Sequence, residues 1–340
     1  MKKNKVLVTG GLGYIGSHTC IKMLEQGIQP VVLDNLSNSS LKVIDRIKNI
    51  TGKELIFING DIRDETLLDS IFSSNDFYSV IHFAGLKSVG ESVRKPIEYY
   101  DNNVVGTLNL IKSMQGANVK KIIFSSSATV YGEPSDIPLT ESSQVGGTTN
   151  PYGSSKYMVE GILTDLYKSC EEWSITLLRY FNPVGAHSSG LIGEDPQGIP
   201  NNLAPFIAQV AIGRHHEVKI FGNDYATIDG TGVRDYIHVM DLASGHIAAL
   251  NKVSHKPGLH VYNLGTGKGT SVLEMINAFE VASGAKIPYT IVERRAGDIA
   301  ECWSSPAKAL NELNWKAQLT LQEMVQDSWR WQLMNPNGFK

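Results

Sequence analysis

Val6-Leu7-Val8-Thr9-Gly10-Gly11-Leu12-Gly13-Tyr14-Ile15-Gly16 is the stretch that decides the fold of this chain. A short apolar run leads into a glycine-rich turn, and a helical pattern opens directly after the turn. Glycines at positions 10, 13 and 16 allow a tight turn and a close approach of the backbone, so the helix N-terminus can bind a pyrophosphate through its amides and its dipole. The stretch predicts a dinucleotide-binding unit, with a purely structural glycine turn as the alternative.

An acidic residue supports the nucleotide interpretation. Asp34 ends the next apolar run, Val31-Val32-Leu33, and comes 18 residues after Gly16. From the end of a second strand, its carboxylate can accept hydrogen bonds from the hydroxyls of an adenosine ribose. A 2'-phosphate would be repelled there, which favours NAD over NADP. Asp61, after the third apolar run, is expected to contact the adenine side of the cofactor, with a helix cap as the alternative.

Further apolar runs alternate with longer helical patterns through about residue 180. Runs that are apolar on both faces and separated by helices predict the strands of a buried parallel sheet. We therefore expect an α/β fold in which a doubly wound parallel sheet of the Rossmann type forms an NAD-binding domain over residues 1–181. The later runs are Leu55-Ile56-Phe57-Ile58, Val80-Ile81-His82-Phe83, Ile122-Ile123-Phe124 and Ile175-Thr176-Leu177-Leu178.

The composition changes after about Asn182. Loops such as 190–200 and 222–232 are rich in Gly, Pro, Asn and Asp, and several helical patterns lie between them. This favours a smaller, mixed C-terminal lobe that builds a substrate pocket from residues 182–232 and 265–340. Segments near 233–264 are expected to complete the first domain, and two strand candidates for that return are Tyr236-Ile237-His238-Val239 and Val261-Tyr262-Asn263-Leu264.

The overall composition argues against several classes of protein. The chain has 340 residues, of which 42% are hydrophobic and 19% charged, and its net charge of -3 favours neither nucleic acid nor membrane as a partner. The basic N-terminus precedes an apolar run of only three residues, so we expect no signal peptide and a cytoplasmic protein. Cys20, Cys170 and Cys302 are widely spaced and fit neither a disulfide framework nor a zinc site, so no metal is expected.

Tyr152-Gly153-Ser154-Ser155-Lys156 places a phenol and an ammonium group four residues apart. On a helix such residues share a face, so the charge of Lys156 can favour the phenolate of Tyr152. Ser127 ends the run Ser125-Ser126-Ser127 after the fifth strand candidate, where it can donate to a sugar oxygen and relay a proton to Tyr152. Each motif alone is compatible with surface or loop-capping residues, but the two in this order predict a base that acts on an alcohol.

These motifs resemble the extended short-chain dehydrogenase/reductase family and, within it, the UDP-hexose 4-epimerases. The matching stretches run across nearly the whole chain, and several lie in the second lobe, which makes the match narrower than an analogy of fold. Besides the glycine turn they are His82-Phe83-Ala84-Gly85-Leu86-Lys87, Tyr99-Tyr100-Asp101-Asn102-Asn103, Ser125-Ser126-Ser127-Ala128-Thr129-Val130-Tyr131-Gly132, Leu178-Arg179-Tyr180-Phe181-Asn182-Pro183-Val184-Gly185-Ala186 and Gly232-Val233-Arg234-Asp235-Tyr236-Ile237-His238-Val239.

The resemblance implies a tightly bound NAD, a UDP-hexose substrate and a homodimer. A diphosphate needs cations such as Arg234 and Arg295, and uracil can stack on Phe221, so the residue types agree with these ligands. The implied cofactor-binding residues are Gly10, Gly13, Tyr14, Ile15, Gly16, Asp34, Asn35, Ser39, Asp61, Ile62, Phe83, Ala84, Gly85, Lys87, Asn102, Ser125, Tyr152, Lys156, Tyr180 and Phe181. The implied substrate-binding residues are Ser127, Tyr152, Asn182, Asn202, Leu203, Phe221, Arg234, Arg295, Asp298 and Cys302.

The implied reaction interconverts UDP-glucose and UDP-galactose. Tyr152 takes the proton of the sugar 4-hydroxyl, directly or through Ser127, while NAD takes hydride from C4. When the resulting 4-keto sugar turns and presents its other face, hydride and proton return with inverted configuration. Lys156 is expected to lower the pKa of Tyr152 and to bind the nicotinamide ribose.

Two other functions are compatible with parts of the pattern. A nucleotide-sugar 4,6-dehydratase forms a similar 4-keto sugar, but its elimination step typically uses an Asp-Glu pair where this chain has Ala128-Thr129. A non-catalytic NAD-binding scaffold is the second alternative, and it gains nothing from a phenol and an ammonium group held together. Both are therefore disfavoured relative to epimerisation.

Cys302 departs from the pattern of many bacterial relatives, which carry a bulky Tyr at this position near the sugar. A smaller side chain should leave room for an N-acetyl group at C2, as in family members, such as vertebrate ones, that also carry Cys. We therefore expect activity on UDP-N-acetylglucosamine and UDP-N-acetylgalactosamine as well, with a neutral packing change as the alternative.

Overall fold

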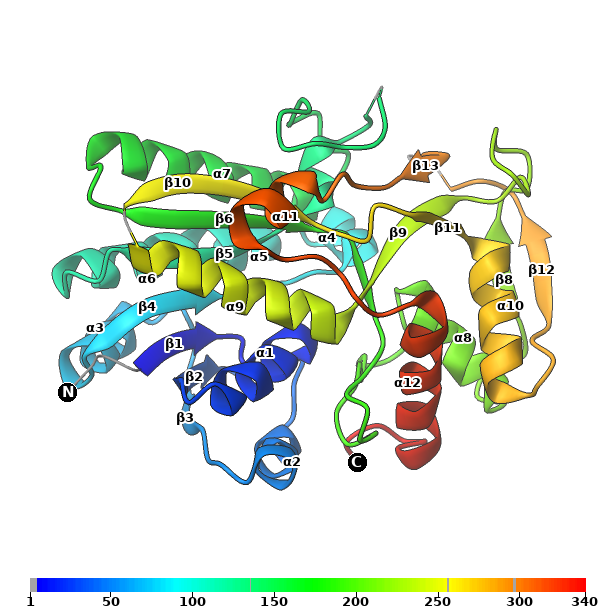
Figure 1. Cartoon of the computed structure of the whole chain (residues 1–340), viewed down its shortest axis with the longest axis horizontal. Helices are drawn as coiled ribbons and strands as arrows, with labels where there is room; N and C mark the ends of the chain where they lie inside the picture. Colours follow the sequence, from blue (N-terminus) through cyan, green and yellow to red (C-terminus); the bar gives the residue numbers. More distant parts are fainter. Residues whose placement is uncertain (1–4, 135, 256, 296–297) are drawn as a thin grey trace.

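The computed structural model describes residues 5–134, 136–255, 257–295 and 298–340. Its larger lobe is a parallel sheet covered by helices on both faces (Figure 1). Within the described residues this sheet has seven strands in the order β10-β6-β5-β4-β1-β2-β3, which confirms the predicted doubly wound α/β fold. The strands are β1 (Lys5–Thr9), β2 (Gln29–Asp34), β3 (Ile56–Asn59), β4 (Phe77–His82), β5 (Lys121–Ser127), β6 (Ser174–Tyr180) and β10 (Gly258–Leu264).

The continuous apolar runs build one core on each face of the sheet, because successive strand residues point to opposite sides. Val6 and Val8 of β1 belong to one core and Leu7 to the other. The first core contains residues of α1, α2 and α9, and the second contains residues of α3, α6 and α7. These helices are α1 (Tyr14–Glu25), α2 (Lys42–Thr51), α3 (Glu65–Ser74), α6 (Gly106–Gly116), α7 (Pro151–Ser169) and α9 (Val239–His255).

Short helical segments connect β4 to α6 and β5 to α7. They are α4 (Val89–Arg94), α5 (Pro96–Tyr100), a π-helical turn (Asp101–Val105) and a 3-10 turn (Ala128–Tyr131). Helices α4 and α5 both pack against α7, the helix that carries the predicted base. None of the helices in the described part of the chain is long and apolar enough to cross a membrane.

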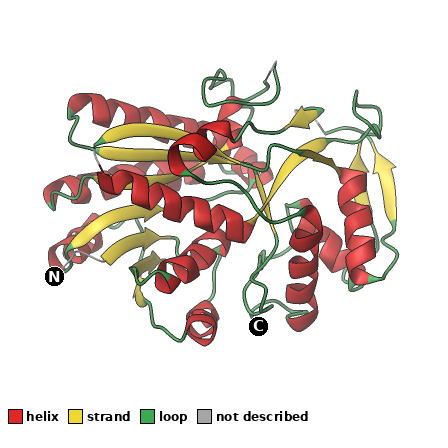
Figure 2. Cartoon of the chain, in the orientation of Figure 1, coloured by secondary structure: helices red, strands yellow, loops and turns green. Residues whose placement is uncertain are grey.

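The smaller lobe begins at Asn182, where the predicted change in composition occurs. Directly after β6 the chain leaves the large sheet, and β7 pairs with β9 in a small separate sheet (Figure 2). A third core lies between the strands of this lobe and three of its helices. The elements are β7 (Asn182–Val184), α8 (Leu203–Ala211), β8 (Val218–Phe221), β9 (Val233–His238), β11 (Gly269–Ser271), α10 (Val272–Ser283), β12 (Tyr289–Val292), β13 (Glu301–Cys302) and α12 (Leu321–Met334). Helix α11 (Ala307–Leu313) instead packs against β10 and α9 of the large lobe.

One of the two strand candidates for the return to the large sheet is correct. Val261–Leu264 lies in β10, which pairs with β6 in parallel. Tyr236–His238 lies in β9, which does not join the large sheet. It pairs in parallel with Asn182–Val184 of β7, a strand that has already left the large sheet for the smaller lobe. The chain therefore returns to the large lobe at α9 rather than at residue 233.

Candidate active site

The glycine turn lies at the carboxyl edge of the large sheet, between β1 and α1. Gly10 has a φ of 69°, and its amide donates to the carbonyl of Leu33 at 2.8 Å. A Cβ on Gly10 would lie 2.7 Å from the amide nitrogen of Ala84, and one on Gly16 would lie 2.4 Å from the carbonyl oxygen of Gly10. Helix α1 starts after Gly13 without a side-chain cap, so its first amides are left to a ligand. This cradle fits a pyrophosphate.

Asp34 fastens the glycine turn to the end of β2. Its Oδ2 accepts from the Leu12 amide at 3.0 Å, and its Oδ1 accepts from the Leu36 amide at 2.9 Å and the Ser39 hydroxyl at 2.8 Å. A carboxylate offers about four acceptor positions, so a ribose hydroxyl can still donate to Asp34. The position and charge of this side chain fit NAD.

Asp61 does not cap a helix, because α3 is capped by Asp64, which accepts from the Leu67 amide. Instead Arg63 donates to both carboxylate oxygens of Asp61, and Asn35 donates to Oδ2 at 2.9 Å. These hydrogen bonds, those from Arg63 above all, hold the pKa of Asp61 well below its usual range. Contact of Asp61 with adenine stays a prediction.

The loop after β4 crosses the end of β1 and approaches the catalytic helix. The amides of Phe83 and Ala84 both donate to the carbonyl of Thr9, at 3.0 Å each. A Cβ on Gly85 would lie 3.7 Å from Nζ of Lys156. Other predicted cofactor residues serve packing: Ile15 lies against the first core, Ile62 in the second, and Phe181 in a small cluster with Val130, Tyr131 and Leu139.

Tyr152 and Lys156 are buried on α7, below the carboxyl end of β5. The Asn150 side chain accepts from the Gly153 amide and caps the helix, which fixes Tyr152 in its first turn. Nζ of Lys156 donates to the carbonyl of Ser125 at 2.8 Å. The hydroxyl of Ser125 shares a 2.6 Å hydrogen bond with the Tyr180 hydroxyl, on the neighbouring strand β6. The predicted catalytic group is therefore assembled at one edge.

The protonation of this group differs in part from expectation. Burial raises the pKa of Tyr152, and a hydrogen bond with Ser127 acts in the opposite direction. Lys156 bonds the Ser125 carbonyl, and burial lowers its own pKa to about 8, with Glu160 opposing that shift. The expected lowering of the Tyr152 pKa by Lys156 is therefore not found: burial, the larger cause, raises this pKa, and the opposing cause is Ser127.

A cavity of about 460 Å³ opens in the smaller lobe. It lies between β8, β9, the start of α8 and the segment after β12. Seven of the ten predicted substrate residues line it, namely Asn182, Asn202, Leu203, Phe221, Arg234, Arg295 and Asp298. Ser127, Tyr152 and Cys302 do not line it, so the cavity does not include the predicted catalytic group.

Stacked and paired side chains shape the wall of this cavity. The guanidinium of Arg295 lies 4.4 Å from the ring centre of Phe221, and its Nε donates to Asp298 Oδ2 at 2.9 Å. One face of Phe221 is therefore covered by Arg295, which leaves the other face for a base. Arg234 donates to its neighbour's carbonyl at 2.8 Å and keeps further guanidinium donors for a phosphate.

Cys302 lies beside the cavity wall, although it does not line the cavity. In β13 it is in register with Arg234 of β9, and its side chain packs against the cluster that contains Phe181. Burial raises the pKa of Cys302 to about 11, so the side chain is a neutral thiol. In the described residues no group of three or more His, Cys, Asp or Glu side chains could hold a metal ion.

The comparisons with known proteins agree with this geometry. A family model described as GDP-mannose 4,6 dehydratase matches residues 7–328. The UDP-glucose 4-epimerase of Haemophilus influenzae is 62% identical over 335 residues, which are 98% of this chain and 99% of that protein. The chain belongs to the UDP-glucose 4-epimerase family.

Solved structures of this family share the fold closely. The UDP-glucose 4-epimerase from Bifidobacterium longum, in complex with NAD+ and UDP, is 57% identical with a TM-score of 0.95, over 98% of this chain and 99% of that one. The UDP-Glc/GlcNAc 4-epimerase from Campylobacter jejuni is 36% identical with a TM-score of 0.86, over 97% and 99%. The resemblance stated from the motifs is thereby confirmed.

A buried ion pair, missed in the sequence, holds the base-bearing helix of this family member against the sheet. Arg179 Nη2 lies 2.6 Å from Glu160 Oε2, and each side chain is 6% exposed. Ser126 also donates to Glu160 at 2.6 Å, and Arg179 donates to the Tyr131 hydroxyl at 3.2 Å. The spacing could have indicated that Glu160 lies on the same face of the helix, since it follows Lys156 by the same four residues that separate Lys156 from Tyr152.

Asn103, next to the predicted Asn102, was also missed. It is buried on the π-helical turn, where its Oδ1 accepts from the Leu86 amide at 2.8 Å. Its Nδ2 donates to the Ser155 hydroxyl of α7 at 2.9 Å. Asn103 therefore fixes the loop after β4 to the catalytic helix, whereas a cofactor contact of Asn102 stays a prediction.

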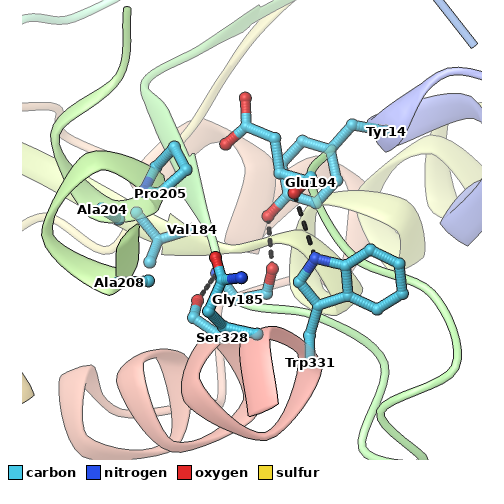
Figure 3. A pocket seen from close by; sticks show the side chains of 10 residues that line it. Tyr14, Val184, Gly185, Glu194, Ala204, Pro205, Ala208, Ser328 and Trp331 are labelled. Carbon is cyan, nitrogen blue, oxygen red and sulfur yellow. Dashed lines mark hydrogen bonds between the residues drawn. The ribbon is translucent and has the colours of Figure 1, made fainter. Parts of the chain in front are cut away.

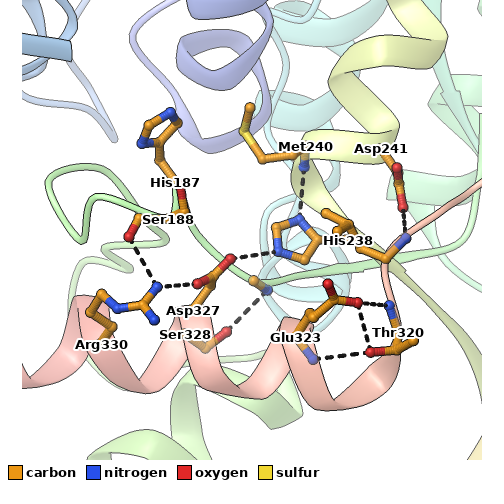
Figure 4. A network of polar contacts seen from close by, with 12 residues as sticks. His187, Ser188, His238, Met240, Asp241, Thr320, Glu323, Asp327, Ser328 and Arg330 are labelled. Carbon is orange, nitrogen blue, oxygen red and sulfur yellow. Dashed lines mark hydrogen bonds and ion pairs between the residues drawn. The ribbon is translucent and has the colours of Figure 1, made fainter.

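The two lobes meet beside the glycine turn (Figure 3). The Tyr14 hydroxyl donates to the Gly185 carbonyl at 2.6 Å, and the Gly185 amide donates to Ser328 of α12 at 3.0 Å. The Tyr14 side chain thus faces the smaller lobe, which leaves its main chain for a cofactor. Nearby, His238 of β9 lies 3.3 Å from Asp327 of α12, so α12 also anchors the strand that carries Arg234 (Figure 4).

Proposed function

We propose that this chain interconverts UDP-glucose and UDP-galactose by epimerisation at C4, with a tightly bound NAD that is regenerated in each turnover. The observation that carries the proposal is the buried group of Tyr152, Ser127 and Lys156 at the carboxyl edge of the sheet, beside the glycine turn. The cavity with Arg234 and Arg295 supports a UDP-sugar as the ligand. The NAD-bound and UDP-bound relative from Bifidobacterium longum supports both ligands.

The chain's own residues supply proton transfer and orientation. Tyr152, ionised beside the cofactor, takes the proton of the 4-hydroxyl directly or through Ser127, and later returns it to the opposite face. Bound NAD would supply the acceptor and donor of the hydride at C4. Lys156, held by the Ser125 carbonyl, is oriented to bind the nicotinamide ribose with its remaining donors. The cationic cavity keeps the nucleotide bound while the 4-keto sugar turns.

Elimination of water, the dehydratase reaction, lacks its acid and base here. Ala128 and Thr129 follow Ser127 in a 3-10 turn, and the Thr129 amide donates to the Ser127 hydroxyl at 3.2 Å. Neither side chain carries a carboxylate that can donate a proton to a leaving hydroxyl. The family model's description names a dehydratase, but these two positions favour epimerisation.

We also propose activity on the N-acetylated UDP-hexoses. Cys302 lies beside Phe181 and Arg234, and its thiol is small enough to leave room for an acetamido group near the sugar. The UDP-Glc/GlcNAc relative from Campylobacter jejuni supports this breadth within the fold. Rates with UDP-galactose and UDP-N-acetylgalactosamine should be compared side by side.

Cys302→Tyr is the variant that tests the steric argument. We expect turnover of UDP-N-acetylgalactosamine to fall about tenfold or more while turnover of UDP-galactose stays within about threefold, because an overfilled site costs about 1–3 kcal/mol. Cys170→Tyr, at a partly buried position outside the site, is the control. Unchanged N-acetyl activity in Cys302→Tyr, or none in the parent, contradicts the proposal.

A homodimer is proposed for a separate reason. Apolar side chains are exposed on helices that pack side by side, with Val93 on α4, Ile97 on α5 and Met158 on α7. A contiguous apolar surface of this kind suits a second copy of the chain, since homodimer interfaces are rich in apolar area. Light scattering after size exclusion should give twice the mass of 37.2 kDa, and a monomer would refute the dimer.

A cytoplasmic location is the last part of the proposal. Cys20, Cys170 and Cys302 are unpaired thiols, as expected in a reducing compartment. Fractionation of cells that express the protein should recover it with cytoplasmic enzymes, and recovery with secreted or membrane fractions would refute this.

A further inference from the structure

Glu194 lies where the two lobes meet, and its carboxylate contacts one predicted binding residue from each. Its Oε1 lies 3.1 Å from Nζ of Lys87, in the loop after β4 of the large lobe. The same oxygen lies 2.8 Å from Nδ2 of Asn202, which lines the cavity of the smaller lobe. The Glu194 side chain is 10% exposed, whereas that of Lys87 is 50% exposed, so water partly screens the ion pair.

The contact with Glu194 fixes which way the Asn202 amide points. An ionised carboxylate only accepts hydrogen bonds, so the amide nitrogen must face Glu194 and the amide oxygen must point elsewhere. Asn202 occupies the N-cap of α8 but makes no capping hydrogen bond, although Asn is a preferred N-cap residue. Glu194 therefore draws the Asn202 side chain away from the helix and holds one rotamer of a residue in the cavity wall.

The other partner, Lys87, balances the charge of Glu194. An uncompensated carboxylate between two sites for anionic diphosphates would weaken both ligands, and the ammonium of Lys87 offsets this repulsion. An ammonium has three donors, so Lys87 can keep Glu194 and still donate to a cofactor. In Figure 3 the carbonyl of Glu194 faces the indole of Trp331, which donates to it at 3.1 Å, and the carboxylate points the other way. Helix α12 thus holds the main chain of Glu194 in place.

We propose that Glu194 is a positioning residue that couples the cofactor site to the UDP-sugar site. Through Lys87 it senses the ligand of the large lobe, and through Asn202 it presents an ordered amide to the ligand of the smaller lobe. The identity of the two ligands rests on the proposed function. Glu194 itself takes no part in proton or hydride transfer.

Glu194→Ala and Glu194→Gln separate the two contacts, with UDP binding measured by calorimetry on the NAD-containing protein. Glu194→Ala should weaken UDP binding and raise KM for UDP-galactose about tenfold, with kcat within about threefold, because a charge-assisted hydrogen bond to the ligand-binding amide is lost. Glu194→Gln keeps an acceptor for Asn202 but loses the charge, so UDP binding should weaken and KM for UDP-galactose should rise by about threefold. Glu25→Ala, which breaks the exposed pair with Lys22, is the control and should change neither value.

A double-variant comparison identifies Asn202 as the route. In an Asn202→Ala background, Glu194→Ala should weaken UDP binding by less than about twofold, because its partner is already absent. If the losses of UDP affinity in the two single variants multiply in the double variant, the coupling is overturned. Unchanged UDP affinity in Glu194→Ala also overturns it. A fall in bound NAD or melting temperature that accounts for the whole loss also overturns it, in favour of a merely structural role. A parent protein that does not bind UDP refutes the proposed function and, with it, the coupling.

Discussion

The catalytic edge and the sugar cavity of this chain are built on opposite principles. At the edge, Lys156 is buried and donates to a main-chain carbonyl, so strand geometry fixes its position. In the cavity, Arg295 and Asp298 form a pair whose side chains are 59% and 23% exposed, on a loop beyond β12. The predicted catalytic group is thus buried within regular structure, whereas part of the cavity wall lies on a partly exposed loop.

Two of the ion pairs in the described residues, Glu160–Arg179 and Arg295–Asp298, make the same contrast in energetic terms. Glu160 and Arg179 are desolvated behind α7, so the loss of either leaves an uncompensated buried charge. Arg295 and Asp298 remain in contact with water, where an ion pair contributes little to stability. Changes at the first pair should therefore act on folding, and changes at the second on ligand affinity.

Tyr152→Phe should give the largest effect of the variants on turnover. It removes the proposed base at the catalytic edge and leaves the cavity unchanged. Loss of the phenolic proton carrier removes general base catalysis, so kcat for UDP-galactose should fall about 10²- to 10⁴-fold. UDP affinity by calorimetry should stay within about twofold, because the cavity does not include Tyr152. Tyr157→Phe on the exposed face of the same helix is the matched control. Near-normal turnover in Tyr152→Phe would contradict the role.

The two ion pairs should respond in opposite ways to single substitutions. Glu160→Gln should lower the free energy of unfolding by about 3–5 kcal/mol, measured by urea denaturation. Arg295→Met should change that free energy by less than about 1 kcal/mol, yet weaken UDP binding about tenfold or more through loss of a phosphate contact. Glu172→Gln, which breaks an exposed pair with Lys120, controls for loss of a carboxylate. Equal losses of unfolding free energy in Glu160→Gln and Arg295→Met would contradict the proposed difference between the buried and the exposed ion pair.

Acid should weaken the large lobe by a smaller, graded amount. Burial lowers the pKa of His18 and His82 to about 3 and that of His246 to about 4. The unfolded chain binds protons at these imidazoles below about pH 6.5 but the folded chain does not, so stability is full above that pH and falls toward pH 4. Each histidine contributes a slope of about 1.4 kcal/mol per pH unit.

The measurement is a series of urea unfolding curves between pH 7.5 and pH 5. His246→Gln should reduce the slope of the free energy of unfolding against pH by about 1.4 kcal/mol per pH unit, the contribution of one histidine. A stability that is flat over this range, or that rises as the pH falls, would show that these imidazoles are not neutral in the folded protein.

The sequence predicted the catalytic edge better than the cavity, for a physical reason. Glycine spacing, strand-end serines and a four-residue helical interval are local patterns, and each maps directly to backbone geometry. The strand Tyr236–His238 was misassigned because an apolar run does not reveal its pairing partner, here β7. The pKa of Tyr152 was misjudged because burial depends on the whole fold rather than on the distance to Lys156.

Long-range contacts of the cavity and of the lobe junction carried no local signal. Stacking of Arg295 on Phe221 joins residues from two distant segments, as do the contacts of Glu194 with Lys87. The resemblance supplied the cavity residues, and seven of them do line one cavity. Glu194 belongs to none of the motifs, and Asn103 lies in a matching stretch whose pattern assigned it no role, so their contacts reveal what each does.

The most direct test of the account follows the hydrogen on C4. UDP-galactose labelled with deuterium at C4 should be converted to UDP-glucose that keeps the deuterium at C4, without added NAD, because the hydride that leaves C4 is the one that returns. Mass spectrometry with proton NMR of the product reads this directly. A product that carries hydrogen at C4, a 4-keto-6-deoxy sugar, or no conversion would contradict the account.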